Sequence, residues 1–167
     1  MKLLLMATLG LAAFSQTIDF NLDAVAAKAK EKAEITLDGP LLTKALEHAP
    51  EKVQGSVSNV SRFMLRHYEF DKKGEYSDAD LEPVRKQVSS ATGWSRILST
   101  KEDDESVEIY MLSQNGKPSG FLLIAAEAKE LTVVHVIGSI ELAQLQEVVK
   151  STIAYDLSTA GAPAAGH

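Results

Sequence analysis

The spacing of hydrophobic and polar positions changes along the chain, and it is helical in the N-terminal part. Over residues 19–33 the apolar positions recur every three or four residues, which predicts a helix. Its apolar stripe is mostly alanine and consists of Leu22, Val25, Ala26, Ala29 and Ala33. A short extended piece is predicted at 35–37. A second short helix is then predicted to begin at Asp38-Gly39-Pro40, because proline suits the first turn of a helix. It is predicted to end at Ala49-Pro50, because proline disfavours helix in the residue before it. Its inward residues are Leu41, Leu42, Ala45 and Leu46.

From about Ser61 the hydrophobic pattern repeats every two residues, which predicts a strand of about ten residues. The composition of residues 71–74 predicts a turn after it. Ser77 to Asp80 resembles a helix capping box with aspartate in place of glutamate. The buried edge of the next helix, which ends near Ser90, consists of Leu81, Val84 and Val88. Proline is tolerated only in the first turn of a helix, so Pro83 favours Asp80 over Ser77 as the capping residue, with a loose turn before it.

The remainder of the chain has the pattern of a meander. Four strands are predicted, at 94–100, 107–113, 119–126 and 131–138. The first turn, 101–106, is charged, and the second contains Asn115-Gly116, a pair typical of a tight hairpin. Residues 121–124 are apolar on both faces, so this strand is expected to be central and covered on both sides. A closing helix is predicted from Leu142, Leu145, Val148 and Val149.

This order of elements predicts an α+β fold. We expect one mostly antiparallel sheet of about five strands with helices packed on it, preceded by two short helices. The expected organisation is a signal peptide at 1–15, an N-terminal helical segment packing on the domain at 16–50, the α+β domain at 51–157 and a disordered tail at 158–167.

The first residues have the pattern of a secretory signal peptide. Met1-Lys2 is a short positive start, and an apolar run extends from Leu3 to Phe14. Ala13 and Ser15 are small residues at the positions that a signal peptidase reads, which places cleavage between Ser15 and Gln16. The run is too short to cross a bilayer comfortably. We therefore expect export, to the periplasm or the medium, without stable membrane insertion after cleavage; a buried N-terminal helix and an uncleaved anchor are the alternatives.

Composition and charge narrow the function classes. The 167 residues are 45% hydrophobic and 24% charged, which fits one globular domain. There is no cysteine, which excludes disulfides, cysteine nucleophiles and cysteine metal sites. The net charge of −6 argues against nucleic-acid binding. No Gly-x-Ser-x-Gly, P-loop or His-Glu-x-x-His pattern is present.

The two strand histidines are the candidates for chemistry. His135 lies in an apolar strand, where we expect a half-buried histidine bonded to a neighbour; His67 shares a strand face with Glu69, where a cross-strand or surface pair is expected. The alternative is a small periplasmic hydrolase or metal-dependent enzyme that uses His67, Glu69 or His135 with distant partners. We expect no enzyme activity, and the pattern assigns no catalytic, cofactor-binding or metal-binding residue.

Three further groups have a structural and a functional interpretation. Trp94 either anchors the preceding helix against the sheet or offers an exposed stacking platform, and anchoring is favoured. The acidic run from Glu102 to Glu105 lacks calcium-loop spacing and is expected to be a solvated hairpin tip. The basic residues that could converge on an acidic partner are Arg62, Arg66, Arg85, Lys86 and Arg96.

Five blocks in succession, at 35–42, 66–71, 93–97, 120–127 and 131–138, resemble an uncharacterised bacterial family, the domain-of-unknown-function family 4252. The resemblance covers roughly residues 35 to 150. It implies an exported envelope protein and supplies no catalytic residue. Pro83 departs from the plain helix former expected at that position.

The sequence thus favours a non-catalytic exported module that binds another cell-envelope protein or a small ligand through its sheet or helix layer. Self-association through the apolar strand at 121–126 is a further possibility if that strand lies at an edge. The pattern leaves the partner and the oligomeric state open.

Overall fold

The computed structural model describes Ile18 and residues 20–47, 51, 54–55, 59–141 and 143–144. Its elements are α1 (Asp23–Ala26), β1 (Glu31–Asp38), α2 (Gly39–Leu46), β2 (Val60–Glu69), a 3-10 helix η1 (Asp78–Leu81), α4 (Glu82–Ser90), β3 (Trp94–Glu102), β4 (Glu105–Gln114), β5 (Lys117–Ala126) and β6 (Glu130–Gly138). The predicted signal peptide, the closing helix with its four apolar residues, the 158–167 tail and the end of the second helix at Ala49-Pro50 lie outside the described residues.

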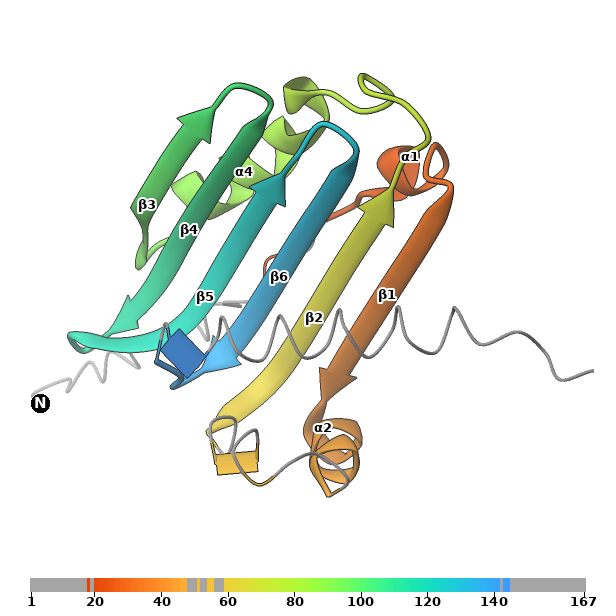
Figure 1. Ribbon diagram of the computed structural model, residues 1–167. Coiled ribbons are helices and arrows are strands. Elements are labelled where there is room, and N and C mark those ends of the chain that lie inside the picture. The colour runs from red at the N-terminus through yellow and green to blue at the C-terminus, as the bar shows by residue number, and fades with distance from the viewer. Residues whose placement is uncertain are drawn as a thin grey trace, which may run out of the picture.

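The strands form one six-stranded sheet in the order β1-β2-β6-β5-β4-β3 (Figure 1). Every neighbouring pair is antiparallel. From β2 the chain crosses through η1 and α4 to β3 at the far edge, and the meander then returns until β6 pairs with β2. The fold is therefore α+β, with six strands rather than about five.

The additional strand is β1, and the predicted helix over 19–33 is wrong. Only α1 is helical within that range, and β1 begins at Glu31. Along β1 the half-buried residues Ala33, Ile35 and Leu37 alternate with exposed ones. Ala29 and Ala33 also fit a helical repeat, but pairing with β2 decides the conformation. The range 16–50 thus contributes a strand to the same sheet as the rest of the domain.

The second helix faces the sheet with one leucine. Leu42 is buried, whereas Leu41 and Ala45, which were expected to point inward, are exposed. The described part of α2 is eight residues long and lies beyond the C-terminal end of β1, on the side where β2 begins (Figure 1). The side chain of Leu46 lies outside the described set.

The start of the third helix differs from the prediction in its cap. Ser77 and Asp80 form the expected capping box, but around the 3-10 turn η1 and not before an α-helix. The backbone N–H of Ser77 donates to the Asp80 carboxylate at 2.8 Å. Helix α4 then begins at Glu82, which puts Pro83 in its first turn, where the missing N–H does no harm. Asp80 is therefore not the cap of α4.

The meander follows the prediction closely. The β4–β5 hairpin turns at Asn115 and Gly116, whose positive φ angles of 51° and 73° fit a tight two-residue turn. Strand β5 is internal and is buried on both faces. The strand at 121–126 is therefore no adhesive edge.

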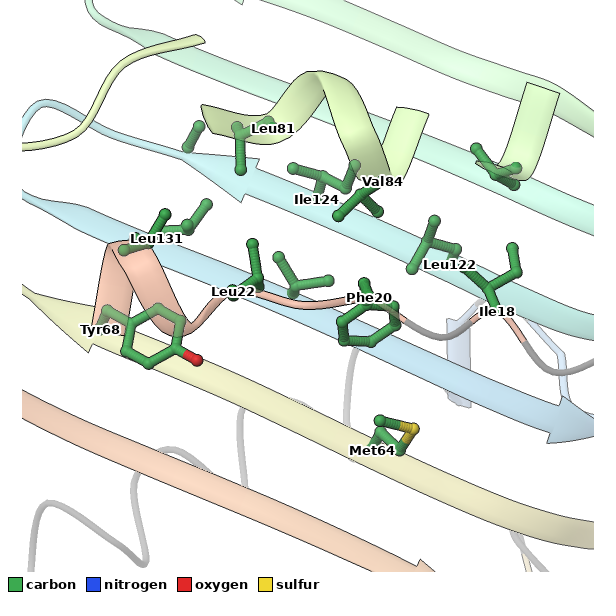
Figure 2. Packing of buried hydrophobic residues seen from close by; sticks show 14 of the residues in the cluster. Ile18, Phe20, Leu22, Met64, Tyr68, Leu81, Val84, Leu122, Ile124 and Leu131 are labelled. Carbon is green, nitrogen blue, oxygen red and sulfur yellow. The ribbon is translucent and has the colours of Figure 1, made fainter. Parts of the chain in front are cut away.

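Two apolar clusters lie on the two faces of the sheet. We call the face that bears Met64, Tyr68, Leu122 and Val133 the helix face, because α1 and α4 cover it (Figures 1 and 2). Leu81, Val84 and Val88 of the crossover pack there, each 0% exposed. The opposite face bears Leu65, Phe121, Leu123 and Val134. Among the described residues, no helix has the length and apolar character needed to span a membrane.

Candidate functional site

His135 lies on the internal strand β6 and points toward the helix face. Its cross-strand neighbours are Met64 on β2 and Leu122 on β5. Its exposed fraction is 0%. The centroid of its ring lies 5.9 Å from that of Phe20, edge to face, and 5.8 Å from that of Trp94. The imidazole is thus enclosed by apolar and aromatic side chains.

The imidazole has no hydrogen-bond partner. Neither Nδ1 nor Nε2 of His135 bonds to any atom of the described chain. The expectation of a half-buried, bonded histidine is therefore wrong, because the strands on both sides present apolar side chains to it. Burial, and after it the positive charge of Arg62, lowers the pKa of His135 to about 4. The ring is neutral at ordinary pH, and one of its nitrogens carries an N–H without an acceptor.

Arg62 is the charged neighbour of this histidine. It pairs in register with Ile137, and Met64 pairs with His135, so Arg62 and His135 are diagonal neighbours on the helix face. The Nε atom of Arg62 is also buried without a partner. Within the described residues, the unpartnered buried side-chain atoms are this Nε and the two imidazole nitrogens. We call these three nitrogens, with the rings of Phe20 and Trp94, the His135 site.

Trp94 is a partly buried packing residue. It is the first residue of β3, pairs with Leu112 and packs against the apolar cluster of the helix face. This position supports the anchoring interpretation over an exposed platform. Its contact with His135 could not be read from the sequence, because it requires the register across β3, β4, β5 and β6.

His67 lies on the opposite face and is fully bonded. Its Nδ1 lies 2.9 Å from the Thr132 hydroxyl, and its Nε2 lies 3.5 Å from a Glu69 carboxylate oxygen. The predicted pair with Glu69 is present, and Thr132 is the cross-strand partner that the sequence could not identify. This arrangement is that of a buried structural histidine.

The sheet separates the two strand histidines. His67 and His135 point to opposite faces, so the hydrolase or metal-site alternative cannot use them together. In the described part of the chain, no group of three or more histidines and acids has an arrangement that could hold a metal ion.

Two of the five basic residues, Arg85 and Arg66, are bonded within the protein. Arg85 on α4 donates from Nε to Glu108 on β4 at 3.0 Å and from Nη2 to Asp78 at 2.8 Å. Arg66 instead donates to the backbone oxygens of Ile35 and Leu65. Burial lowers the pKa of Arg85, but its hydrogen bonds to Asp78 and Glu108 raise it above its usual range overall.

The Arg85–Glu108 pair joins the helix to the sheet. Both side chains are nearly enclosed, with exposed fractions of 14% and 11%. The Tyr110 hydroxyl donates to the same carboxylate at 2.6 Å. Burial and this hydrogen bond raise the pKa of Tyr110. The network is a structural tie between α4 and β4.

The acidic turn is solvated, as predicted. All four residues from Glu102 to Glu105 are exposed. Two adjoining shallow hollows, of about 260 and 430 Å³, lie between this turn and the loops after β2 and β5. At the rim, the Tyr76 hydroxyl donates to the backbone oxygens of Glu127 and Glu130. Burial, and then the charges of Glu130 and Glu105, raises the pKa of Glu127.

The outer edge of β3 is the most exposed part of the sheet. This strand is nine residues long, and each residue after Trp94 is exposed. Within the described chain it pairs with β4 alone. Ile97 and Leu98 are 43% and 40% exposed. Both belong to an open strand edge, and we call these two exposed residues the apolar patch.

The fold and its surfaces define a small α+β protein whose crossover helix and N-terminal segment cover one face of an antiparallel sheet. The sequence model of the family described as "Domain of unknown function (DUF4252)" matches residues 28–148, and the chain belongs to this family. No curated protein and no solved structure matches the chain.

Proposed function

We propose that this protein is an exported, non-catalytic binding module of the bacterial cell envelope, and that it binds an extended segment of a partner protein along β3. Export is supported by the positive start, the apolar run and the small residues before Gln16. The binding mode is supported by one observation, the open and partly apolar edge of β3.

The edge has free backbone groups because a strand with one neighbour leaves alternate N–H and C=O groups unused. The two edge strands differ in the charged residues that discourage pairing with another strand. On β1, four of eight residues are charged: Glu31, Lys32, Glu34 and Asp38. On β3, Ile97–Thr100 is an uninterrupted uncharged stretch. An added strand would gain main-chain hydrogen bonds there together with an apolar contact.

The side chains along β3 define the partner's chemistry. Arg96 pairs with Tyr110 and Lys101 with Ser106, so both basic side chains point toward the helix face. Leu98 pairs with Ile109 and points toward the opposite face. A complementary strand would carry acidic side chains on one face and an apolar side chain on the other.

An irregularity in β3 makes this edge selective. The register shifts between Arg96 and Leu98, so Ile97 is an extra residue in the strand. A bulge increases the local twist and discourages indiscriminate pairing. The partner would pair with the regular run from Leu98 to Glu102 and reach Arg96 across the bulge.

The test is affinity capture of the mature protein from its own envelope with a matched pair of variants. Leu98→Lys places a charge on the apolar patch, and Leu41→Lys does the same on the exposed leucine of α2, which is 59% exposed. We expect Leu98→Lys to reduce the recovered partner at least tenfold and Leu41→Lys to leave it unchanged. Equal recovery with both variants would contradict the proposal, as would recovery of a second copy of this chain alone.

A further inference from the structure

We propose that the His135 site binds a small carboxylate that has an apolar body, and that the ring of Phe20 fills the place of this body in the structure. This inference goes beyond the proposed binding of a partner strand. It rests on a different part of the molecule, the helix face of β6, and does not depend on the open edge of β3.

Two of the three unpartnered nitrogens carry an N–H, which calls for a hydrogen-bond acceptor, and the positive charge of Arg62 favours an anion. Native proteins pair almost all of their buried polar groups, and an unpartnered one calls for a physical reason. Here Arg62 offers an N–H from a cation, and neutral His135, its diagonal neighbour on the sheet, offers a second N–H. A carboxylate accepts several hydrogen bonds and pairs with guanidinium in charge-assisted geometry. A carboxylate therefore satisfies the donors that the described chain leaves without an acceptor.

The walls of the site indicate that the rest of the ligand is apolar. Met64 and Leu122 flank His135 on the neighbouring strands. Phe20 and Trp94 lie against its ring. Because these walls offer a bound molecule only apolar and aromatic surface, a ligand held there buries an apolar or aromatic group.

Phe20 belongs to a segment that can be displaced locally. Ile18, Phe20 and Leu22 lie on an irregular stretch that runs over the sheet and are each at most 6% exposed (Figure 2). Among the described residues, no backbone hydrogen bond joins this stretch to a strand. The stretch is held by side-chain burial. A ligand ring could therefore replace the Phe20 ring without breaking backbone hydrogen bonds of the sheet.

The test uses Trp94, the single tryptophan of the chain, as the reporter. The full mature protein is titrated with phenylacetate and, separately, with the uncharged 2-phenylethanol, and Trp94 fluorescence is recorded. We expect saturable binding of phenylacetate and at least tenfold weaker binding of the alcohol. Phe20→Ala, which removes the competing ring, is expected to bind phenylacetate at least tenfold more tightly than the unmodified protein. Phe20→Leu serves the same purpose if the alanine variant does not fold.

Two variants separate recognition of the carboxylate from simple filling of a cavity. His135→Leu and Arg62→Met are expected to abolish the preference for the acid over the alcohol. His67→Gln, which alters the buried histidine of the opposite face, is expected to keep it. Equal affinity for acid and alcohol in the Phe20 variants, or no saturable binding to any of these proteins, would overturn the inference. Leu98→Lys is expected to leave this titration unchanged, so failure of the carboxylate inference is distinct from failure of the β3 proposal.

Discussion

At the scale of residues, the two buried histidines of the sheet differ in the hydrogen bonding of their ring nitrogens. His67 has partners at both ring nitrogens, whereas His135 has none in the described chain. A buried polar group that lacks a partner costs about 1–3 kcal/mol. Such a cost calls for a physical reason, and the proposed binding of a carboxylate supplies one.

His135 makes the free energy of unfolding depend on pH. Its pKa is about 4 in the folded protein and near the ordinary 6.5 in the unfolded chain. Between these values the unfolded chain holds a proton that the folded protein does not. Stability therefore falls as pH drops from about 6.5 to 4, by about 3 kcal/mol in total.

Urea unfolding of His135→Leu and the unmodified protein at pH 7, 6, 5 and 4 measures this effect. We expect the variant to be more stable by about 1 kcal/mol at pH 7, because it buries no unpartnered group. We also expect its advantage to grow as the pH falls. If the free energies of unfolding of the two proteins changed in parallel across this pH range, the lowered pKa of His135 would be contradicted.

The Arg85–Glu108 pair should contribute to stability as a unit. Arg85→Met leaves a nearly enclosed carboxylate without its cation, and Glu108→Gln leaves the guanidinium without its main acceptor. Each single change is expected to cost about 2 kcal/mol, less than for a fully buried pair because both groups retain some solvent. The double variant is expected to cost at least 1 kcal/mol less than the sum, measured by urea unfolding. Additive losses would show that the two groups act independently.

At the scale of elements, the meander and the crossover helix were predictable because local patterns and tertiary environment agree there. The Asn115-Gly116 turn and the alternation along β2 are examples. Of strand β1, only the extended piece at 35–37 was predicted, since Ala29 and Ala33 fit a helical repeat in the residues before it. The His135 site could not be predicted from the sequence either. It combines Phe20, Arg62 and Trp94, which are far apart in the chain and meet because of the strand order and register.

The position of each strand in the sheet predicts its rate of amide hydrogen exchange. The internal strands β5 and β6 have a neighbour on both sides and are expected to exchange slowest. In β3, only the amides that point toward β4 should be protected, so slow and fast amides should alternate. Exchange measured by NMR on the mature protein checks this. Uniform protection along β3 would show that its outer edge is already covered.

At the scale of the whole molecule, export is the property on which the envelope role depends. We expect the protein recovered from its own cells to begin at Gln16, because Ala13 and Ser15 are the small residues before the predicted cleavage site. Intact-mass and N-terminal peptide analysis of the fractionated cells measures this. A product in the cytoplasm that retains Met1–Ser15 would contradict export.

The central claim is that the open edge of β3 receives a partner strand, and a photo-crosslinker placed at Leu98 tests it most directly. The full chain carries p-benzoylphenylalanine at Leu98 or, as a control, at Leu41, and is irradiated in its own cells. We predict one discrete adduct from Leu98 and none from Leu41, with the crosslinked peptide alternating acidic and apolar residues. No adduct from Leu98, or the same adduct from both positions, would contradict the account.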